Sequence, residues 1–258
     1  MVHFLLLVVI NAFDFLLLSG TASGIGAGTG VADWQQALIY NPAQTMPSER
    51  AGLSMVYARP YGVPELNCAR LGAGFAIKRM NLNAGMQLLG IEGYGEYDFG
   101  VGLGLAITGE VITGVAVHGL LMRMPTAGWL FVPAFDGGIL WSISKFRLGT
   151  AVQNFNRPRF DNGDEVLPRL RAGVAWEPVE PLLLAVDFGK QGESERLLAG
   201  IEVRIFPELK VRAGMETAPW CIRAGFGLKV KRFGVDYGYH YLSELGGTHI
   251  IGVNYTWN

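Results

Sequence analysis

The sequence predicts an all-β protein, a transmembrane antiparallel β-barrel of about 14 strands with a small N-terminal hatch segment. Residues 209–257 alternate between an apolar face and a face of Gly, Arg, Lys, Asp and His, which is the period-two pattern of strands. Of all residues, 50% are hydrophobic and only 17% are charged, yet no apolar run after residue 18 reaches the ~20 residues of a membrane helix. A membrane barrel turns its apolar face to lipid and its polar face to the lumen, which fits both observations.

The chain begins with its one long apolar run, residues 1–18, and small residues follow at 19–23. This order predicts a secretory signal peptide over residues 1–23. A short N-terminal anchor is the alternative, because the run lacks Lys and Arg and is interrupted by Asp14. The stretch Ser19–Gly26 also imitates a glycine-rich nucleotide loop, but no β-α alternation follows it.

Residues 24–50 form the predicted hatch. Trp34, Ala37 and Leu38 share one face of a short helix, which the motif Asn41-Pro42-Ala43 ends. A segment ahead of the first strand of a barrel starts in the periplasm, so we expect it to fold up into the lumen.

The barrel is predicted over residues 51–258, with strand boundaries read from the alternation. The expected strands are 51–58, 69–77, 81–89, 96–107, 112–122, 129–143, 146–152, 169–176, 182–188, 196–205, 209–215, 222–229, 235–241 and 251–257. Connections after even-numbered strands are short, and those after odd-numbered strands are mostly longer, residues 153–168 above all. This asymmetry is typical of outer-membrane barrels and places both termini in the periplasm of a bacterium.

A repeat of polar residue, any residue and glycine runs through the strands, as in Arg212-Ala213-Gly214. Its polar residues share the lumen-facing parity, and opposite charges fall on neighbouring strands, as with Arg171 beside Asp187. Because charges in a narrow lumen are costly unless paired, we predict a salt-bridged network that fills much of the pore. The sequence leaves open whether the network only stiffens the wall or has a role in selectivity or binding. Its predicted members are Arg70, Asp98, Arg147, Arg171, Asp187, Glu202, Arg204, Lys210, Arg212, Arg223, Lys229, Asp236 and His240.

The two cysteines, Cys68 and Cys221, begin predicted strands on the lumen side and at the same height. Four strand steps of ~4.8 Å place them roughly 19 Å apart along the wall. A disulfide would require the loop at 59–67 to fold inward, because bonded cysteines have Cα atoms within about 7 Å. Two free thiols are the other outcome.

No catalytic, cofactor-binding or metal-binding set is evident in the sequence. His118, His240 and His249 are scattered without the spacing of metal ligands, and His240 with Asp236 fits a wall pair better than acid–base chemistry. The net charge of −1 gives no indication of a nucleic-acid partner. We therefore expect a non-enzymatic protein without a cofactor, surrounded by outer-membrane lipid.

Two motifs resemble those of a known family. Asn41-Pro42-Ala43, ahead of the first strand, is similar to the hatch segment of FadL-type barrels. Residues 236–239 (Asp-Tyr-Gly-Tyr) and 245–249 (Leu-Gly-Gly-Thr-His) resemble the last hairpin of the PorV/PorQ group of FadL-like barrels. This resemblance implies about 14 strands and a role with type IX secretion, in which PorV-like members shuttle or hold secreted substrates. FadL itself passes hydrophobic compounds.

Three functions follow as hypotheses. The first is a partner in type IX-like secretion or surface attachment, which binds secretion proteins or secreted substrates at the barrel rim; a closed, ion-paired lumen would favour it. The second is a FadL-like transporter of small hydrophobic molecules, which a lateral gap and an apolar path would favour. The third is a soluble β-protein with a lipid or carbohydrate pocket, which requires that Tyr237, Tyr239, Tyr241, Tyr255 and Trp257 be buried.

Overall fold

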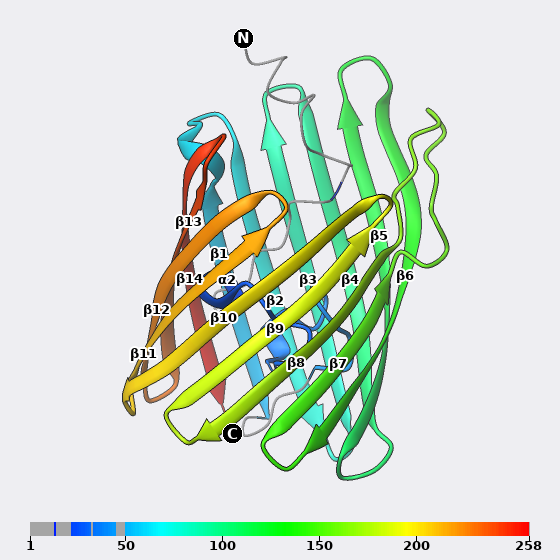
Figure 1. Cartoon of the computed structure of the whole chain (residues 1–258). Coiled ribbons are helices and arrows are strands. Elements are labelled where there is room, and N and C mark those ends of the chain that lie inside the picture. Colours follow the sequence, from blue (N-terminus) through cyan, green and yellow to red (C-terminus); the bar gives the residue numbers. More distant parts are fainter. Residues whose placement is uncertain (1–12, 14–21, 32, 45–49, 258) are drawn as a thin grey trace.

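Fourteen antiparallel strands close into one barrel around a short N-terminal segment (Figure 1). The computed structural model describes residues 13, 22–31, 33–44 and 50–257. Of the predicted signal peptide, only Phe13, Ala22 and Ser23 belong to the described residues. The strands are β1 (Ala51–Arg59), β2 (Asn67–Ile77), β3 (Met80–Ile91), β4 (Tyr94–Ala106), β5 (Val111–Met124), β6 (Gly128–Ile143), β7 (Phe146–Gln153), β8 (Arg169–Val179), β9 (Leu182–Gln191), β10 (Ser194–Phe206), β11 (Leu209–Thr217), β12 (Trp220–Val230), β13 (Phe233–Leu242) and β14 (Gly246–Trp257).

Each strand pairs with its neighbours in sequence, and β14 pairs with β1 to close the sheet. The closing ladder runs from Ala51 opposite Trp257 to Arg59 opposite His249. Closure leaves no free sheet edge, so all strands can satisfy their backbone hydrogen bonds without water. The predicted all-β barrel and its strand number are confirmed.

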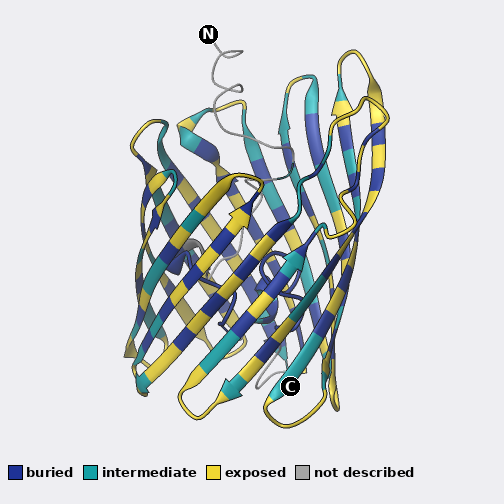
Figure 2. Cartoon of the chain, turned by 45° about the vertical axis from the view of Figure 1, so that its right-hand side comes forward, coloured by how far each residue is buried: buried dark blue, intermediate teal, exposed yellow. Residues whose placement is uncertain are grey.

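Side chains alternate between the two faces of the wall along every strand (Figure 2). Large apolar side chains on the outer face are exposed, among them Leu53, Phe131 and Val253. Tyr241 also lies on this face and is 47% exposed. The hypothesis of a soluble β-protein is therefore wrong, because the apolar face that it buries is turned outward.

The two ends of the barrel differ less than predicted. One end, called the loop end below, carries residues 60–66, with the short 3-10 helix η2 (Pro60–Gly62), and residues 154–168. The connections at residues 92–93 and 243–245 follow odd-numbered strands and are nevertheless short, because β3, β4 and β14 are longer than predicted. The other end, called the turn end, carries short turns such as 144–145 and 231–232 and the end of β14.

The predicted hatch lies inside the barrel as far as it is described (Figure 1). It consists of the four-residue helix α2 (Ala22–Ile25), a 3-10 turn η1 (Trp34–Gln36) capped by Asp33, and tight turns up to Gln44. The expected helical face thus shortens to a single turn, and most of its residues are buried against the wall. Among the described residues, no helix is both long and apolar enough to cross a membrane.

Candidate functional site: the plugged lumen

A buried carboxylate on β9 fixes the middle of the hatch. Asp187 accepts hydrogen bonds from the backbone N–H of Gly28 at 2.8 Å, from the N–H of Thr29 at 2.7 Å and from the Thr29 hydroxyl at 2.7 Å. All three donors reach the same oxygen, Oδ2. Asp187 thus holds this segment with three hydrogen bonds at one buried oxygen atom.

The motif Asn41-Pro42-Ala43 forms a second attachment. The Asn41 side-chain amide donates to the carbonyl of Thr29 at 3.2 Å and to the carbonyl of Ile139 on β6 at 3.0 Å. Its oxygen accepts the N–H of Ala43 at 3.0 Å, which closes a local turn. Asn41 thus ties the two halves of the hatch to each other and to the wall.

Glycines of the wall form the seat for this motif. A side chain at Gly138 on β6 would collide with Asn41, and one at Gly114 on β5 would collide with the backbone of Pro42 and Ala43. Gly114 therefore makes room for the backbone of the hatch, and Gly138 makes room for the Asn41 side chain.

The aromatic ring of Tyr40 lies at the centre of the plug. The Arg171 guanidinium lies over the ring, 4.8 Å from its centroid, and the Tyr40 hydroxyl donates to the carbonyl of Gly26 at 3.3 Å. Burial raises the pKa of Tyr40 above its ordinary value, so the hydroxyl stays neutral and keeps this donor role. Gly26 has a φ of +83°, which favours glycine at this close approach to Arg223.

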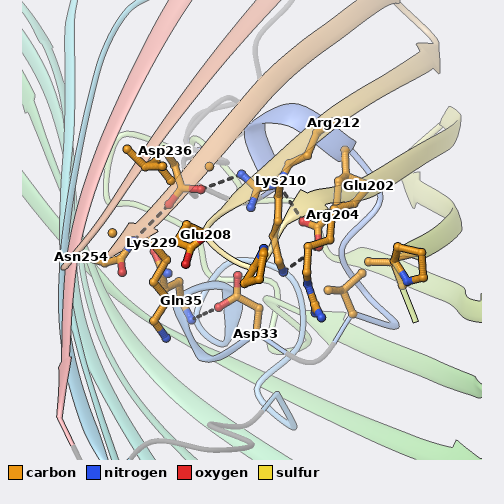
Figure 3. A pocket seen from close by; sticks show the side chains of 18 of the residues that line it. Asp33, Gln35, Glu202, Arg204, Glu208, Lys210, Arg212, Lys229, Asp236 and Asn254 are labelled. Carbon is orange, nitrogen blue, oxygen red and sulfur yellow. Dashed lines mark hydrogen bonds and ion pairs between the residues drawn. The ribbon is translucent and has the colours of Figure 1, made fainter. Parts of the chain in front are cut away.

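A charged cluster surrounds the turn-end mouth, where a cavity of about 460 Å³ opens (Figure 3). Arg212 bridges Glu202 on β10 at 2.8 Å and Asp236 on β13 at 2.6 Å, and Lys210 also binds Glu202 at 2.7 Å. Asp236 accepts a further hydrogen bond from Asn254 at 3.1 Å. These contacts join four strands, β10, β11, β13 and β14, into one network that reaches across β12.

The remaining predicted charges are distributed around the lumen rather than joined in one network. Arg204 and Lys229 line the mouth and are exposed, and Arg147 pairs with Glu177 at 2.6 Å. Arg70 donates to the backbone carbonyl of Gln35 in the hatch.

Two predicted pairings are corrected by the contacts. Asp187 holds Gly28 and Thr29 rather than forming an ion pair with Arg171, and Asp236 pairs with Arg212 rather than with His240. In both cases a partner two strands away or from the hatch reaches the carboxylate, because the lumen is narrow enough for long side chains to cross it.

Sequence reasoning missed two clusters. Glu216 binds Arg223 and lies 3.6 Å from Arg196, just beyond the predicted end of its strand. The His118 ring lies between Asp98, 2.8 Å from Nδ1, and Asp136, 3.3 Å from Nε2. The alternation along the strands could have predicted both clusters, because it places these residues on the lumen side. The sequence analysis considered His118 only as a possible metal ligand.

Both cysteines are free and buried. Cys68 lies in an apolar cluster with Val56 and Leu89 on the loop-end half of the wall. Cys68 and Cys221 are not joined in this structure, and whether they form a disulfide stays a prediction to be tested. Within the described part of the chain, no group of three or more His, Cys, Asp and Glu side chains could hold a metal ion.

Two packed apolar clusters fill the loop-end half of the lumen, and together they are called the loop-end chamber below. One side is a cluster on β5 and β6 that residues 154–168 cover by inserting Phe160 and Val166, which are 2% and 1% exposed. The other side is the cluster around Cys68. Phe13 packs against both clusters, and its ring stacks on Phe160 at a centroid distance of 6.1 Å.

Several solved protein structures have a fold similar to this barrel. Searches with protein-family models and of curated proteins find no match. The chain is similar to the Ralstonia pickettii toluene transporter TbuX, with a TM-score of 0.74, 11% identity and coverage of 96% of this chain and 100% of that one. The CymD monoaromatic hydrocarbon channel has a TM-score of 0.70 and 13% identity, and the match covers 96% of this chain and 99% of that one. A Pseudomonas aeruginosa FadL homologue has a TM-score of 0.64 and 11% identity, and the match covers 93% of this chain and 98% of that one. The fold is that of the FadL-type channels.

The FadL-type fold extends over almost the whole described chain, hatch included. It confirms the coarser part of the predicted resemblance, a FadL-like barrel of 14 strands. The finer assignment to the PorV/PorQ group stays a prediction, since the matches named above are FadL-type channels.

Proposed function

We propose that the protein is a bacterial outer-membrane channel that takes up small hydrophobic compounds, with its loop end outside the cell and its C-terminus in the periplasm. The observation that carries this proposal is the apolar chamber at the loop end. Residues 154–168 bury Phe160 and Val166 inside the lumen. A loop that only connected two strands would not need to place apolar side chains there. Binding sites for small hydrophobic molecules are lined mostly by apolar side chains, as these two clusters are. The fold shared with a toluene transporter and a monoaromatic hydrocarbon channel supports the same substrate class.

The hatch lies beneath the chamber and is the gate of the proposed channel. Phe13, Leu38 and Ile39 line one small cavity of about 40 Å³, whose other lining residues are mostly polar, Asp98 and Arg169 among them. A polar layer therefore lies between the apolar clusters and the hatch. Passage toward the turn end requires that the hatch move away from Asp187 and from its glycine seat.

A thin part of the wall offers a sideways route for the same compounds. Gly72, Gly85 and Gly100 are consecutive cross-strand neighbours on β2, β3 and β4, so no inward side chain thickens the wall there. Leu38 of the hatch covers Gly85 and Gly100 from inside, and an apolar groove of about 1100 Å³ lies over the same strands outside. The ladders across these strands are continuous, so this route would open only when strands part.

Uptake of radiolabelled toluene by cells that export the full chain tests the proposal. The variant Val132→Arg places a charge in the chamber, and Val115→Ile on the outer face is the matched control. We expect uptake above that of cells without the protein, its loss in Val132→Arg and its retention in Val115→Ile, with folding of each variant checked by heat-dependent migration in gels. Uptake equal to that of cells without the protein would contradict the proposal.

The secretion-partner role is the second candidate, and one observation favours it. The ladder is unbroken around the barrel and the turn-end half is ion-paired, so the lumen is closed in this state. If this role is correct, cells that lack the protein should retain secreted proteins in the periplasm, and they should be rescued by the Val132→Arg variant. A channel function predicts no such retention.

A further inference from the structure

The outward face of β1 to β6 has a hollow in an otherwise bulky apolar surface. Ala73 on β2 lies opposite Ala84 on β3, and Gly119 on β5 lies opposite Pro133 on β6. These small residues line the apolar groove of about 1100 Å³ described above, and the larger side chain of Phe131, which is 62% exposed, borders it. On a wall that faces lipid, hydrocarbon chains fill such a hollow, because the bilayer core holds no water.

One cation lies on the same face, on the loop-end side of this groove. Arg123 on β5 is exposed, and its guanidinium lies over the ring of Trp129 on β6, 5.8 Å from the ring centroid. Tyr97 on β4 packs against Trp129 with a centroid distance of 5.5 Å. Among the described residues, no carboxylate forms an ion pair with Arg123, so its charge is available to an anion from outside the chain.

The spacing along β5 fits the two ends of a lipid molecule. Gly119 precedes Arg123 by four residues, which is ~13 Å along a strand and about 10 Å of depth for a strand tilted by ~40°. Half of the hydrocarbon core of a bilayer is about 15 Å thick. When Arg123 lies at the headgroups, the groove therefore lies beside the acyl chains of the same leaflet. Trp129 and Tyr97 are residue types that are enriched at this boundary.

We propose that this face binds one phosphate-bearing lipid of the surrounding bilayer, with its phosphate on Arg123 and its acyl chains in the groove. The phosphate oxygens would accept charge-assisted hydrogen bonds from the guanidinium. Stacking on Trp129 limits the conformations of the Arg123 side chain, so less conformational entropy is lost when the phosphate binds. The proposal requires that the barrel lie in a membrane, but it does not require that the barrel be a channel.

A lipid at this place would cover the thin part of the wall from outside. Gly72, Gly85 and Gly100 line the same groove, and Leu38 of the hatch covers two of them from inside. In the proposed channel, this lipid would have to leave before the strands could part at the sideways route.

Native mass spectrometry of the exported protein in detergent tests the proposal with dioleoyl phosphatidic acid and dioleoylglycerol, which differ only by the phosphate group. Inorganic phosphate is titrated as the soluble source of the same group. Arg123→Gln removes the cation, and Arg79→Gln, in the exposed turn between β2 and β3 at the turn end, is its control. Ala84→Trp fills the groove, and Ala172→Trp, on the exposed face of β8, is its control. Heat-dependent migration in gels shows that each variant is folded.

We expect dioleoyl phosphatidic acid to bind about fivefold more tightly than dioleoylglycerol, which is the contribution of one arginine near an anionic headgroup. Arg123→Gln should bring this ratio below about twofold, whereas Arg79→Gln should leave it unchanged. Ala84→Trp should weaken both lipids by at least about threefold, because less apolar surface is buried, and Ala172→Trp should bind as the unchanged protein. A ratio that Arg123→Gln does not change, or that Arg79→Gln lowers equally, would overturn the role of Arg123.

The same spectra separate the other occupants of the groove. Inorganic phosphate that binds as tightly as dioleoyl phosphatidic acid, or lipid binding that Ala84→Trp leaves unchanged, would overturn the role of the groove. A protein dimer that Ala84→Trp dissociates would assign the groove to a second copy of the chain and overturn the lipid site. None of these results depends on toluene uptake, so failure of the lipid site and failure of the channel function are distinguishable.

Discussion

At the scale of single residues, the lumen is shaped as much by missing side chains as by charged ones. Gly114 lies where the backbone of the hatch touches the wall, and Gly138 leaves the space that the Asn41 side chain fills. The sequence shows the glycines and their parity, so their lumen-facing position could be predicted. What they contact could not, because the partner is an irregular segment without a periodic pattern.

Gly138→Ala should loosen the hatch, and Gly137→Ala should not. A methyl group at Gly138 collides with Asn41, whereas one at Gly137 meets nothing within 4 Å. Overpacking of this kind costs about 1–3 kcal/mol. We expect a lower unfolding temperature for Gly138→Ala alone, measured by loss of the folded band in gels after heating. Equal unfolding temperatures of the two variants would show that the hatch does not need this seat.

At the scale of elements, the barrel strands and the hatch differ in what determines them. The strands carry their own period-two pattern, and their predicted ranges agree with the structure within a few residues. The hatch has only a four-residue helix and a three-residue turn, too short to be stable alone, so its shape comes from its contacts with the wall. This is why the predicted helical face around Trp34 shortens to one turn.

Asp187→Ala should release the hatch and open the lumen. The substitution removes the acceptor of three hydrogen bonds from Gly28 and Thr29, each with a donor that would remain buried. In planar bilayers, we expect the unchanged protein to be closed or nearly so and Asp187→Ala to give larger and more frequent openings. Glu193→Ala, in the exposed turn of the same hairpin, is the control and should behave as the unchanged protein. A closed Asp187→Ala barrel would mean that Asn41 and the glycine seat hold the hatch without it.

At the scale of the whole molecule, the sequence predicted the barrel wall better than the contacts inside its lumen. Parity placed the predicted charges on the lumen side, but the pairs depend on reach across a curved and narrow interior. Arg212 therefore meets Asp236, two strands away, and Asp187 meets the hatch. The apolar chamber was missed because residues 154–168 carry no periodic pattern that shows Phe160 turning inward.

The closed barrel should protect both thiols until it unfolds as a unit. Cys68 and Cys221 are free and almost fully buried on the lumen side. We expect the folded protein to react slowly with a maleimide and the denatured protein to gain two labels by mass, with or without a reductant. A requirement for the reductant would show that a disulfide forms after all. Rapid labelling of Cys68 in the folded protein would show that the loop-end chamber is open to water.

In the proposed channel, the hatch also determines the polarity of the surface that a passing molecule contacts. Without the described hatch residues, the middle of the tube would present Asp187, Arg171 and Arg223 to water, with bare glycine backbone between them. Such a hydrophilic tube would favour ions over hydrophobic compounds. Leu38, Ile39 and Tyr40 provide the apolar surface that the wall lacks at this height. A hatch that shifts but stays inside the barrel would keep an apolar surface along the passage. A hatch that is expelled would turn the same barrel into a water-filled pore.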